Sequence, residues 1–310
     1  MKTPVIHILL ATYNGSKYLN QQLESIANQS YNEWTLTVSD DGSTDNTCEL
    51  IENFSKRAKQ RVNLIQGPKS GSSTANFFNL IKAIENFNDN DLFAFCDQDD
   101  VWLKDKLSVS VIWHNKKSHH TARLYCGRTY ITDENLRCIG ASPIPTRPID
   151  FGNAVVQNIA SGNTMVMSSA VLNTLKKLKP EHSVWHDWST YIVVTAMGGI
   201  VEFDKTPYLL YRQHNDNVIG INSGLKAQIL RLIPIFNGRY KLWSELTERS
   251  ILDIIEDIHS DMITTFNYFR KIRAATSPYC RLVYWGKSKI RRQTLISNLS
   301  LATAIALRLF

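Results

Sequence analysis

The first hundred residues alternate between short apolar runs and longer stretches in which apolar residues recur every three or four positions. The apolar runs have the length and composition of buried strands and occupy residues 5–10, 34–39, 62–66 and 92–96. Helical spacing is found between them, over residues 17–28, 47–59 and 75–86. This alternation predicts an α/β fold with a doubly wound, mostly parallel sheet that carries helices on both faces.

The rest of the chain follows a different pattern. Residues 120–224 mix short strand-like pieces with loops that contain Pro and Gly. Beyond residue 224 the pattern becomes helical, and one long helix is expected over residues 240–273. We therefore expect an α/β domain over residues 1–224 and a helical, basic C-terminal extension over residues 225–310.

Polar residues follow three of the predicted strands. The strand ends are residues 12–15, 40–45 and 97–100, the last of which reads Asp97-Gln98-Asp99-Asp100. In doubly wound sheets, ligands bind beyond the carboxyl ends of the strands. We therefore expect these three loops to converge on one site.

The acidic strand end is the first candidate for chemistry. Asp97 and Asp99 are two positions apart, so one or both carboxylates can hold Mg²⁺ or Mn²⁺, whose remaining positions go to waters and substrate phosphates. The alternative is a solvated turn whose acids cap the following helix, a role that fits Asp100 or Asp105. At the second strand end, Asp41 can accept hydrogen bonds from a nucleobase or a ribose hydroxyl, or can belong to a capped turn.

Two later segments are also dense in polar side chains. Asp187 lies between His186 and Trp188, where partial desolvation would raise its pKa toward that of a general base; the alternative is that it caps a helix. Arg212 and His214 can supply phosphate or metal ligands.

Composition limits the class of protein. Hydrophobic residues make up 43% and charged residues 20% of the 310, which is ordinary for a globular protein and excludes a disordered chain. The five cysteines are scattered without a C-x-x-C pair, so we interpret them as free thiols in a reducing compartment, with no zinc site. The first ten residues lack the long apolar core of a signal peptide.

The net charge of +7 is unevenly distributed. Residues 270–310 contain nine Lys and Arg and no Asp or Glu, and an apolar stretch over residues 294–307 follows the basic cluster. A basic tail predicts an anionic partner, either phospholipid or nucleic acid. The apolar stretch falls short of a spanning helix, so it lies either in a membrane interface or against the body of the protein.

Taken together, these segments resemble the family 2 glycosyltransferases, inverting enzymes with the GT-A nucleotide-sugar fold. The resemblance covers residues 4–224. Six motifs in order carry it: A-T-Y-N-G at 11–15, S-D-D-G-S-T-D at 39–45, D-Q-D-D-V-W at 97–102, S-G-N-T-M at 161–165, H-D-W at 186–188 and R-Q-H-N-D-N-V-I-G at 212–220. The third, fifth and sixth motifs are particularly similar to those of bacterial rhamnosyltransferases that build O-antigen and cell-wall rhamnan.

The resemblance implies roles on the donor side. Thr12, Tyr13 and Asp41 match positions that hold the nucleoside, with Asn14 among them and Asp41 facing the base. Asp97 matches the carboxylate near the ribose and is a second candidate for the metal.

It also implies roles for the metal and the acceptor. Asp99 matches the residue that binds Mn²⁺ or Mg²⁺, and His214 falls in a loop, opened by Arg212, that closes over the diphosphate. Asp187 matches the catalytic base. Gly162, Asn163 and Thr164 match the floor beneath the acceptor sugar, and Trp188 is assigned to the same side.

The implied partners are a dTDP- or UDP-linked sugar, with dTDP-rhamnose the leading choice, and a lipid-linked glycan acceptor. The basic tail would then bind the inner face of the plasma membrane, which places the protein in the cytoplasm as a peripheral enzyme. Nucleic acid is not expected, because the tail lacks aromatic residues at stacking positions.

The chain departs from the family in two places. Asp187 follows a histidine where many members have Glu-Asp, and the Q-x-x-R-W motif of processive synthases is absent, which favours addition of one or a few sugars. The alternatives are a transferase that uses a UDP-hexose, a nucleotidyltransferase and a non-catalytic carbohydrate-binding module. The Gly-rich basic loop of nucleotidyltransferases is poorly matched, and a non-catalytic module would be expected to lose Asp99 or Asp187.

Overall fold

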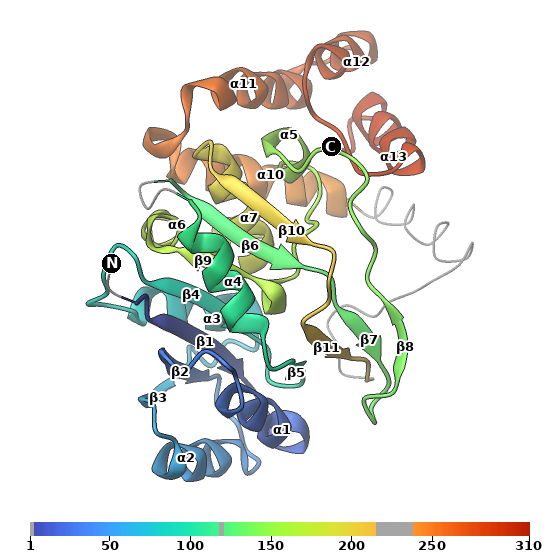
Figure 1. The fold of residues 1–310 in the computed structure, drawn as a ribbon. Helices are drawn as coiled ribbons and strands as arrows, with labels where there is room; N and C mark the ends of the chain where they lie inside the picture. The colour runs from blue at the N-terminus through green and yellow to red at the C-terminus, as the bar shows by residue number, and fades with distance from the viewer. Residues whose placement is uncertain (1–2, 118–120, 215–237) are drawn as a thin grey trace. The chain divides into compact units, whose positions relative to one another are not determined.

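A computed structural model describes residues 3–117, 121–214 and 238–310 (Figure 1). The chain forms two compact units. Unit 1 comprises residues 1–144, 160–176 and 200–216, and unit 2 comprises residues 145–159, 177–199 and 217–310. The expected domain boundary at residue 224 lies outside the described residues. Two segments that we expected in the α/β domain, 145–159 and 177–199, group with the C-terminal helices, so the units interleave along the chain.

Unit 1 is built on a seven-stranded sheet of order β10-β6-β9-β4-β1-β2-β3. Its strands are β1 (Ile6–Thr12), β2 (Trp34–Asp40), β3 (Val62–Gln66), β4 (Leu92–Cys96), β6 (Arg123–Gly127), β9 (Val166–Ser168) and β10 (Ile200–Asp204). Only the short β9 runs antiparallel to its neighbours, β4 and β6. The four predicted strands and the mostly parallel, doubly wound sheet are confirmed.

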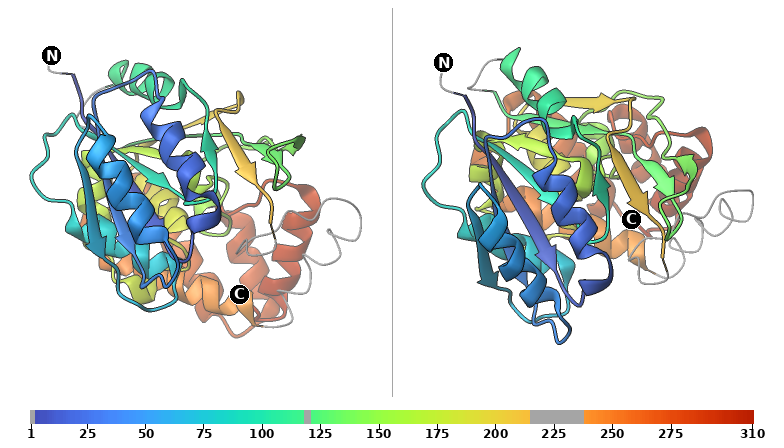
Figure 2. Two further views of the ribbon diagram at one scale, coloured as in Figure 1. Left: turned by 90° about the horizontal axis from the view of Figure 1, so that it is seen from below. Right: turned by 60° about the horizontal axis from the view of Figure 1, so that its bottom comes forward.

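Helices cover both faces of this sheet because its strands are apolar on both sides. They are α1 (Ser16–Ala27), α2 (Thr47–Arg57), α3 (Ser73–Ala83), α4 (Lys106–Asn115) and α6 (Ser169–Leu175). Helices α1 and α2 lie together beside this sheet (Figures 1 and 2). Leu23 of α1 and Phe54 of α2 share one core with Ile8 of β1. On the other face, the ring of Phe77 in α3 meets Phe95 of β4 at 5.3 Å between centroids.

A second, four-stranded sheet of order β5-β11-β7-β8 extends unit 1. Its strands are β5 (Val101–Trp102), β7 (Tyr130–Thr132), β8 (Cys138–Ala141) and β11 (Leu209–Arg212). Strand β5 follows the acidic strand end directly and pairs antiparallel with β11. This pairing brings Arg212, more than a hundred residues later in the sequence, to the acidic loop.

Unit 2 is helical. Its elements are α5 (Phe151–Ala154), η2 (Pro180–His182), α7 (His186–Ala196), α10 (Arg239–Asp253), η3 (Ile255–Asp257), α11 (Ser260–Ala274), α12 (Pro278–Lys287) and α13 (Leu295–Ala306). Asn153 of α5 connects two of its parts, because its Oδ1 accepts the Tyr191 hydroxyl of α7 at 3.0 Å and its Nδ2 donates to the Arg291 carbonyl at 3.0 Å. A helical C-terminal region is thus confirmed.

The single helix expected over residues 240–273 is wrong. The chain leaves the helix after Asp253, turns through η3 and begins α11 at Ser260, where the His259 side chain accepts the Asp261 N–H. Apolar spacing did not reveal the break, because Ile258 within it and Phe266 beyond it are both buried and keep the periodic pattern.

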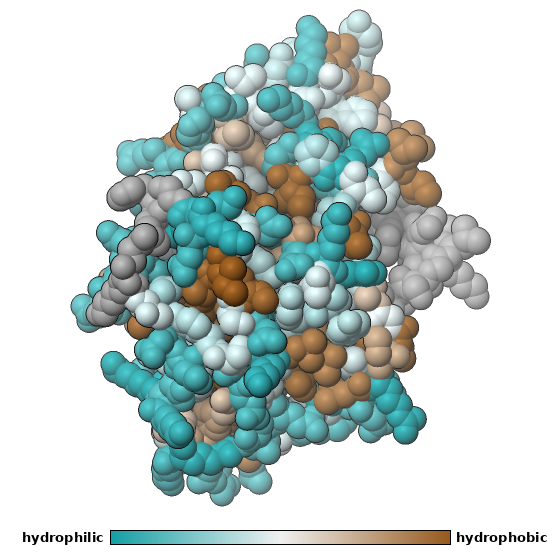
Figure 3. Space-filling model, in the orientation of Figure 1, coloured by the Kyte–Doolittle hydropathy of each residue, from teal (hydrophilic) through white to brown (hydrophobic). Residues whose placement is uncertain are grey.

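Among the described residues, no helix is both long and apolar enough to cross a membrane. Helix α13 nevertheless carries two exposed leucines, Leu295 and Leu299. Hydrophobic residues gather over this helix in Figure 3.

One buried histidine links the core of unit 1 to its acid stability. Nε2 of His114, in α4, lies 3.1 Å from the Val166 carbonyl oxygen of β9. The Arg123 guanidinium donates to the His114 carbonyl at 2.7 Å. Burial, with the positive charge of Arg123 in addition, lowers the pKa of His114 from 6.5 to about 3. The folded state therefore excludes a proton that the unfolded chain binds between these two values.

We expect the free energy of unfolding to fall as the pH is lowered below 6.5 toward 3, and to fall less steeply in His114→Gln. The difference in slope should approach, at most, about 1.4 kcal/mol per pH unit. Urea unfolding of both proteins at several pH values measures it. Desolvation also lowers the pKa of His186 to about 3. Because His186 is present in both proteins, its contribution to the pH dependence cancels in the comparison. Parallel curves would contradict the prediction.

Candidate functional site

The order of strands in unit 1 locates a binding crevice. From β1 the chain proceeds to β2 and β3 on one side, and then returns to place β4 on the other side of β1. The reversal lies between β1 and β4, which pair in parallel, so their carboxyl ends point the same way. Ligands of doubly wound sheets bind at such a switch point. The loops that follow β1, β2 and β4 converge there as expected.

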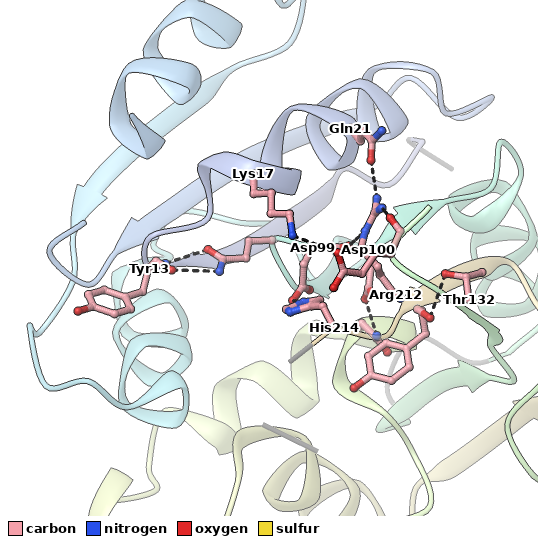
Figure 4. Close-up of polar contacts among 12 residues, drawn as sticks. Tyr13, Lys17, Gln21, Asp99, Asp100, Thr132, Arg212 and His214 are labelled. Carbon is pink, nitrogen blue, oxygen red and sulfur yellow. Dashed lines mark hydrogen bonds and ion pairs between the residues drawn. The ribbon is translucent and has the colours of Figure 1, made fainter. Parts of the chain in front are cut away.

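A double hydrogen bond spans this switch point. The Tyr13 N–H donates to Gln98 Oε1 at 2.9 Å, and Gln98 Nε2 donates to the Tyr13 carbonyl at 3.0 Å (Figure 4). Gly15 leaves room for this contact, because a Cβ there would lie 2.2 Å from Gln98 Oε1 and would displace the Gln98 side chain. The Tyr13 side chain itself is exposed, and so is available to a ligand.

Asp40 organises the loop after β2. Its carboxylate accepts the Thr12 hydroxyl at 2.9 Å, the Ser43 hydroxyl at 2.6 Å and the backbone N–H groups of Gly42 and Ser43. Burial opposes its ionisation, but these hydrogen bonds outweigh burial and lower the pKa of Asp40 below its usual range. Thr12, predicted to touch the nucleoside, is buried and donates to this carboxylate.

Asp41 and Asn14 also join neighbouring loops. The Asp41 carboxylate is buried and accepts the N–H groups of Ser70 and Gly71 at 3.2 and 2.8 Å. Asn14 donates its N–H to the Ser43 hydroxyl at 2.8 Å, and its side-chain oxygen accepts the Thr44 N–H at 2.9 Å. A carboxylate has about four lone-pair sites, so Asp41 keeps the capacity to accept a further donor.

Asp99 and His214 meet in unit 1. Asp99 Oδ2 lies 2.8 Å from His214 Nε2, and the imidazole ring lies 5.0 Å from the Tyr18 ring of α1 (Figure 4). Asp97, which is half-buried, directly follows β4 and precedes Asp99 by two residues. The described residues contain no cluster of three metal-binding side chains. Mg²⁺ and Mn²⁺ do not require one, since one or two carboxylates and the substrate phosphates suffice.

The third acid of the strand end has a different environment. Asp100 is fully buried and accepts a hydrogen bond from Asn163 Nδ2 at 2.5 Å and one from the Arg212 N–H at 3.3 Å. Burial, together with the negative charges of Asp99 and Asp97, raises the pKa of Asp100 well above its usual range. Asp100 does not cap the following helix α4, whose N-cap residue is Asp105.

The predicted acceptor floor is attached to this acid. Gly162, Asn163 and Thr164 form the 3₁₀ turn η1 (Gly162–Thr164) and are all buried. The Ser161 hydroxyl donates to Asn163 Oδ1 at 2.8 Å, which orients the amide so that its nitrogen faces Asp100. The floor and the acidic strand end are thus one hydrogen-bonded unit.

The guanidinium of Arg212 donates its hydrogen bonds to other groups of unit 1. Its Nε donates to the Asp99 carbonyl at 2.9 Å, and its two terminal nitrogens donate to the Glu134 carbonyl and to Gln21 Oε1 (Figure 4). The guanidinium carbon also lies 4.4 Å from the centroid of the Tyr18 ring. One buried cation therefore joins the acidic loop, helix α1 and the segment between β7 and β8. The residues of its motif beyond His214 lie outside the described residues.

Asp187 and Trp188 lie in unit 2, in the first turn of α7. The cap of this helix is Trp185, not Asp187, so the capping alternative is wrong. Asp187 Oδ1 accepts the Trp188 N–H at 2.7 Å. Trp188 is buried and donates Nε1 to the Ala154 carbonyl at 2.7 Å, whereas the half-buried Trp185 stacks on it at 5.9 Å.

Sequence reasoning missed two residues of the site. They are Asp40 and Gln98, neither of which was among the residues predicted from the sequence. The available signal was position: Asp40 is the last residue of β2, and Gln98 is the second residue after β4.

These features agree with a match to a known family. A sequence model of "Glycosyl transferase family 2" matches residues 7–170, more than half of the chain. The chain belongs to glycosyl transferase family 2. The predicted family is thereby confirmed, and the protein is a glycosyltransferase.

Relatives and solved structures extend the match. The enzyme is 29% identical over 241 residues to the dTDP-rhamnosyl transferase RfbG of Shigella flexneri, which covers 75% of this chain and 81% of that protein. It is 22% identical over 270 residues to an uncharacterized glycosyltransferase of Haemophilus influenzae, and this match covers 83% of this chain and 81% of that protein. The structure of S. aureus TarS residues 1–349, in complex with UDP-GlcNAc, covers 96% of this chain and 90% of that one, with a TM-score of 0.56 and 16% identity. That likeness confirms the GT-A-like fold.

Arg212→Lys tests the central role of the buried guanidinium. A lysine keeps the charge but cannot donate in three directions from one plane, so buried acceptors lose their partners. We expect the glycosyltransferase to lose about 2 kcal/mol of stability. The control Arg57→Lys alters an exposed pair with Glu24 and should change stability little. Thermal unfolding of the wild type and the two variants measures their stabilities. Equal losses of stability in Arg212→Lys and Arg57→Lys would contradict the prediction.

Proposed function

We propose that this enzyme is an inverting glycosyltransferase that moves L-rhamnose from dTDP-rhamnose to a hydroxyl of a lipid-linked glycan, in bacterial O-antigen or cell-wall rhamnan synthesis. The observation that carries the proposal is the similarity to a dTDP-rhamnosyl transferase, which extends over 81% of that protein. Because this match exceeds the 7–170 segment of the family as a whole, it includes regions outside the common donor-binding part.

The crevice between β1 and β4 supports donor binding. We assign the nucleoside to Thr12, Tyr13, Asn14 and Asp41, with the exposed Tyr13 side chain nearest to solvent. Asp41 remains able to accept an N–H group of the base, because its two backbone partners leave lone pairs unused. Asp97, at the end of β4, is placed beside the ribose.

The donor set around Asp99 fits a divalent cation, Mn²⁺ or Mg²⁺. A carboxylate oxygen of Asp99 and an imidazole nitrogen of His214 already face each other at 2.8 Å, and Asp97 is the second carboxylate. Such a cation, when bound, offsets the negative charge of the departing diphosphate. Arg212 holds the backbone of Asp99 in place rather than the phosphate, because its nitrogens already donate within the protein.

The chemical step is assigned to Asp187. Its carboxylate takes the proton from the acceptor hydroxyl, whose oxygen attacks the anomeric carbon opposite the leaving diphosphate. The bond to the new oxygen forms as the bond to the diphosphate breaks, so the configuration inverts in one displacement. The half-buried His186 is compatible with this role, because desolvation lowers its pKa to about 3 and keeps the neighbouring imidazole neutral. Gly162, Asn163, Thr164 and Trp188 are assigned to the acceptor side.

The acceptor's lipid places the reaction at the inner face of the plasma membrane, with the enzyme in the cytoplasm and held there through its basic C-terminal region.

The experiment that tests the function incubates the purified protein and Mn²⁺ with dTDP-rhamnose, dTDP-glucose, UDP-glucose and UDP-GlcNAc, and measures donor-induced thermal shifts and nucleoside diphosphate release. We expect the largest response to dTDP-rhamnose. A larger response to a UDP-hexose would replace rhamnose as the substrate, and no response to any donor would contradict the proposal.

Asp187→Asn separates catalysis from donor binding. The amide cannot accept a proton, so we expect transfer to drop by at least about 10³-fold while the donor-induced thermal shift is retained. Asp150→Asn, which changes another acid of unit 2 that pairs with Arg291, serves as a matched control and should retain transfer. Normal turnover in Asp187→Asn would rule out this base.

A further inference from the structure

Helix α13 carries an exposed aliphatic face. None of its twelve residues is charged, and Leu295, Ile296, Leu299 and Leu307, which directly follows it, are 72, 53, 70 and 55% exposed. At 100° per residue these four positions fall within one third of the helix circumference. We call these four residues the aliphatic stripe; hydrophobic residues gather over α13 in Figure 3.

The stripe belongs to a helix that is already fixed in unit 2. Leu301, Ala304 and Ile305 on the opposite side are buried, and the buried Arg281 of α12 donates Nη1 to the Ile305 carbonyl at 2.9 Å. Thr294 caps the start of the helix by accepting the Ser297 N–H. Helix α13 therefore already packs into unit 2 through its opposite side, and the stripe is not part of the core of that unit.

The segment of sequence that contains the stripe is basic. Residues 274–310 contain no Asp or Glu. Arg281 is buried, Arg291 pairs with Asp150, and Arg292 lies over the Tyr240 ring, so these three are engaged within unit 2.

Three cations of this segment stay exposed, on either side of α13 in the sequence. Lys287 and Lys289 precede α13, and Arg308 follows it. Long basic side chains beside an aliphatic surface can direct their charges to anionic headgroups while their methylene stems remain in apolar contact.

We propose that the aliphatic stripe of α13 inserts into the interface of an anionic phospholipid bilayer, with Lys287, Lys289 and Arg308 against the headgroups. This inference deepens the proposed function, and rests on it only for the bilayer that carries the acceptor. Twelve residues extend about 18 Å, too short to span the hydrocarbon core, so the helix lies along the surface. A second copy of the chain is a poorer occupant, because a stable protein interface uses roughly 20–30 residues on each side.

Vesicle co-sedimentation of the full chain tests the proposal, without donor or acceptor, so its result is independent of the transferase activity. The probes are vesicles of phosphatidylcholine alone and of phosphatidylcholine with an equal part of phosphatidylglycerol. We expect binding to the anionic vesicles, weakened by salt, and little binding to the neutral ones.

Two pairs of variants separate the apolar and the charged contributions. Leu295→Gln with Leu299→Gln should weaken vesicle binding by at least about tenfold, since two exposed leucines lose their place in the bilayer. The control, Ile112→Gln with Ile139→Gln, alters two exposed residues of unit 1 and should leave it unchanged. Lys287→Glu with Lys289→Glu should abolish the preference for anionic vesicles, whereas Lys56→Glu with Lys59→Glu, exposed on and near α2, should not.

Thermal unfolding and the dTDP-rhamnose-induced shift, measured on all four double variants, confirm that each is folded and keeps its donor site. The proposal is overturned if the wild-type chain does not bind anionic vesicles, or if the leucine variant binds as well as its control. It is also overturned if the leucine variant changes only the oligomeric state in size-exclusion chromatography, because the stripe would then join two copies.

Discussion

The guanidinium of Arg212 is the interaction on which the donor side of the molecule depends. It is a buried cation whose three nitrogens donate to acceptors on the acidic loop, on α1 and between β7 and β8. A buried charge of this kind is tolerated only when its donors are satisfied, so these three segments must stay in register with one another. The geometry of Asp99 thus follows from a residue that does not itself need to touch the substrate.

The acids around the crevice differ in function because their environments differ. Hydrogen bonds lower the pKa of Asp40, which suits a permanently charged anchor for its loop. Burial beside two other acids raises the pKa of Asp100, which suits a structural link to Asn163. Asp99, paired with His214, is left as the carboxylate with a geometry suited to a cation. These three acids lie close together, so their positions alone do not distinguish them. They differ in how deeply each carboxylate is buried and in how many hydrogen bonds it accepts.

Much of this could be predicted from the order of residues. The four N-terminal strands, the parallel sheet and the convergence of Thr12, Asp41 and Asp97 follow from local periodicity and from the rule that parallel strands end at one edge. The break before His259 could not be predicted, because the apolar spacing continues across it. Gln98 was missed for a related reason: its partner is the backbone of Tyr13, and a backbone partner leaves no trace in the pattern of side chains.

The family, the strand–helix order and the residue types at each strand end follow from the amino-acid sequence alone, since these depend on local spacing and on motifs. The partners of each polar group became visible only in the folded chain. Arg212 was expected to bind phosphate, yet pairing of β11 with β5 buries it beneath Asp99. The basic tail was expected to act through its charge, yet folding engages several of its arginines and leaves the aliphatic stripe exposed. The reason is the same in both cases: a side chain's role depends on desolvation and on partners distant in sequence, and neither is set until the chain has folded.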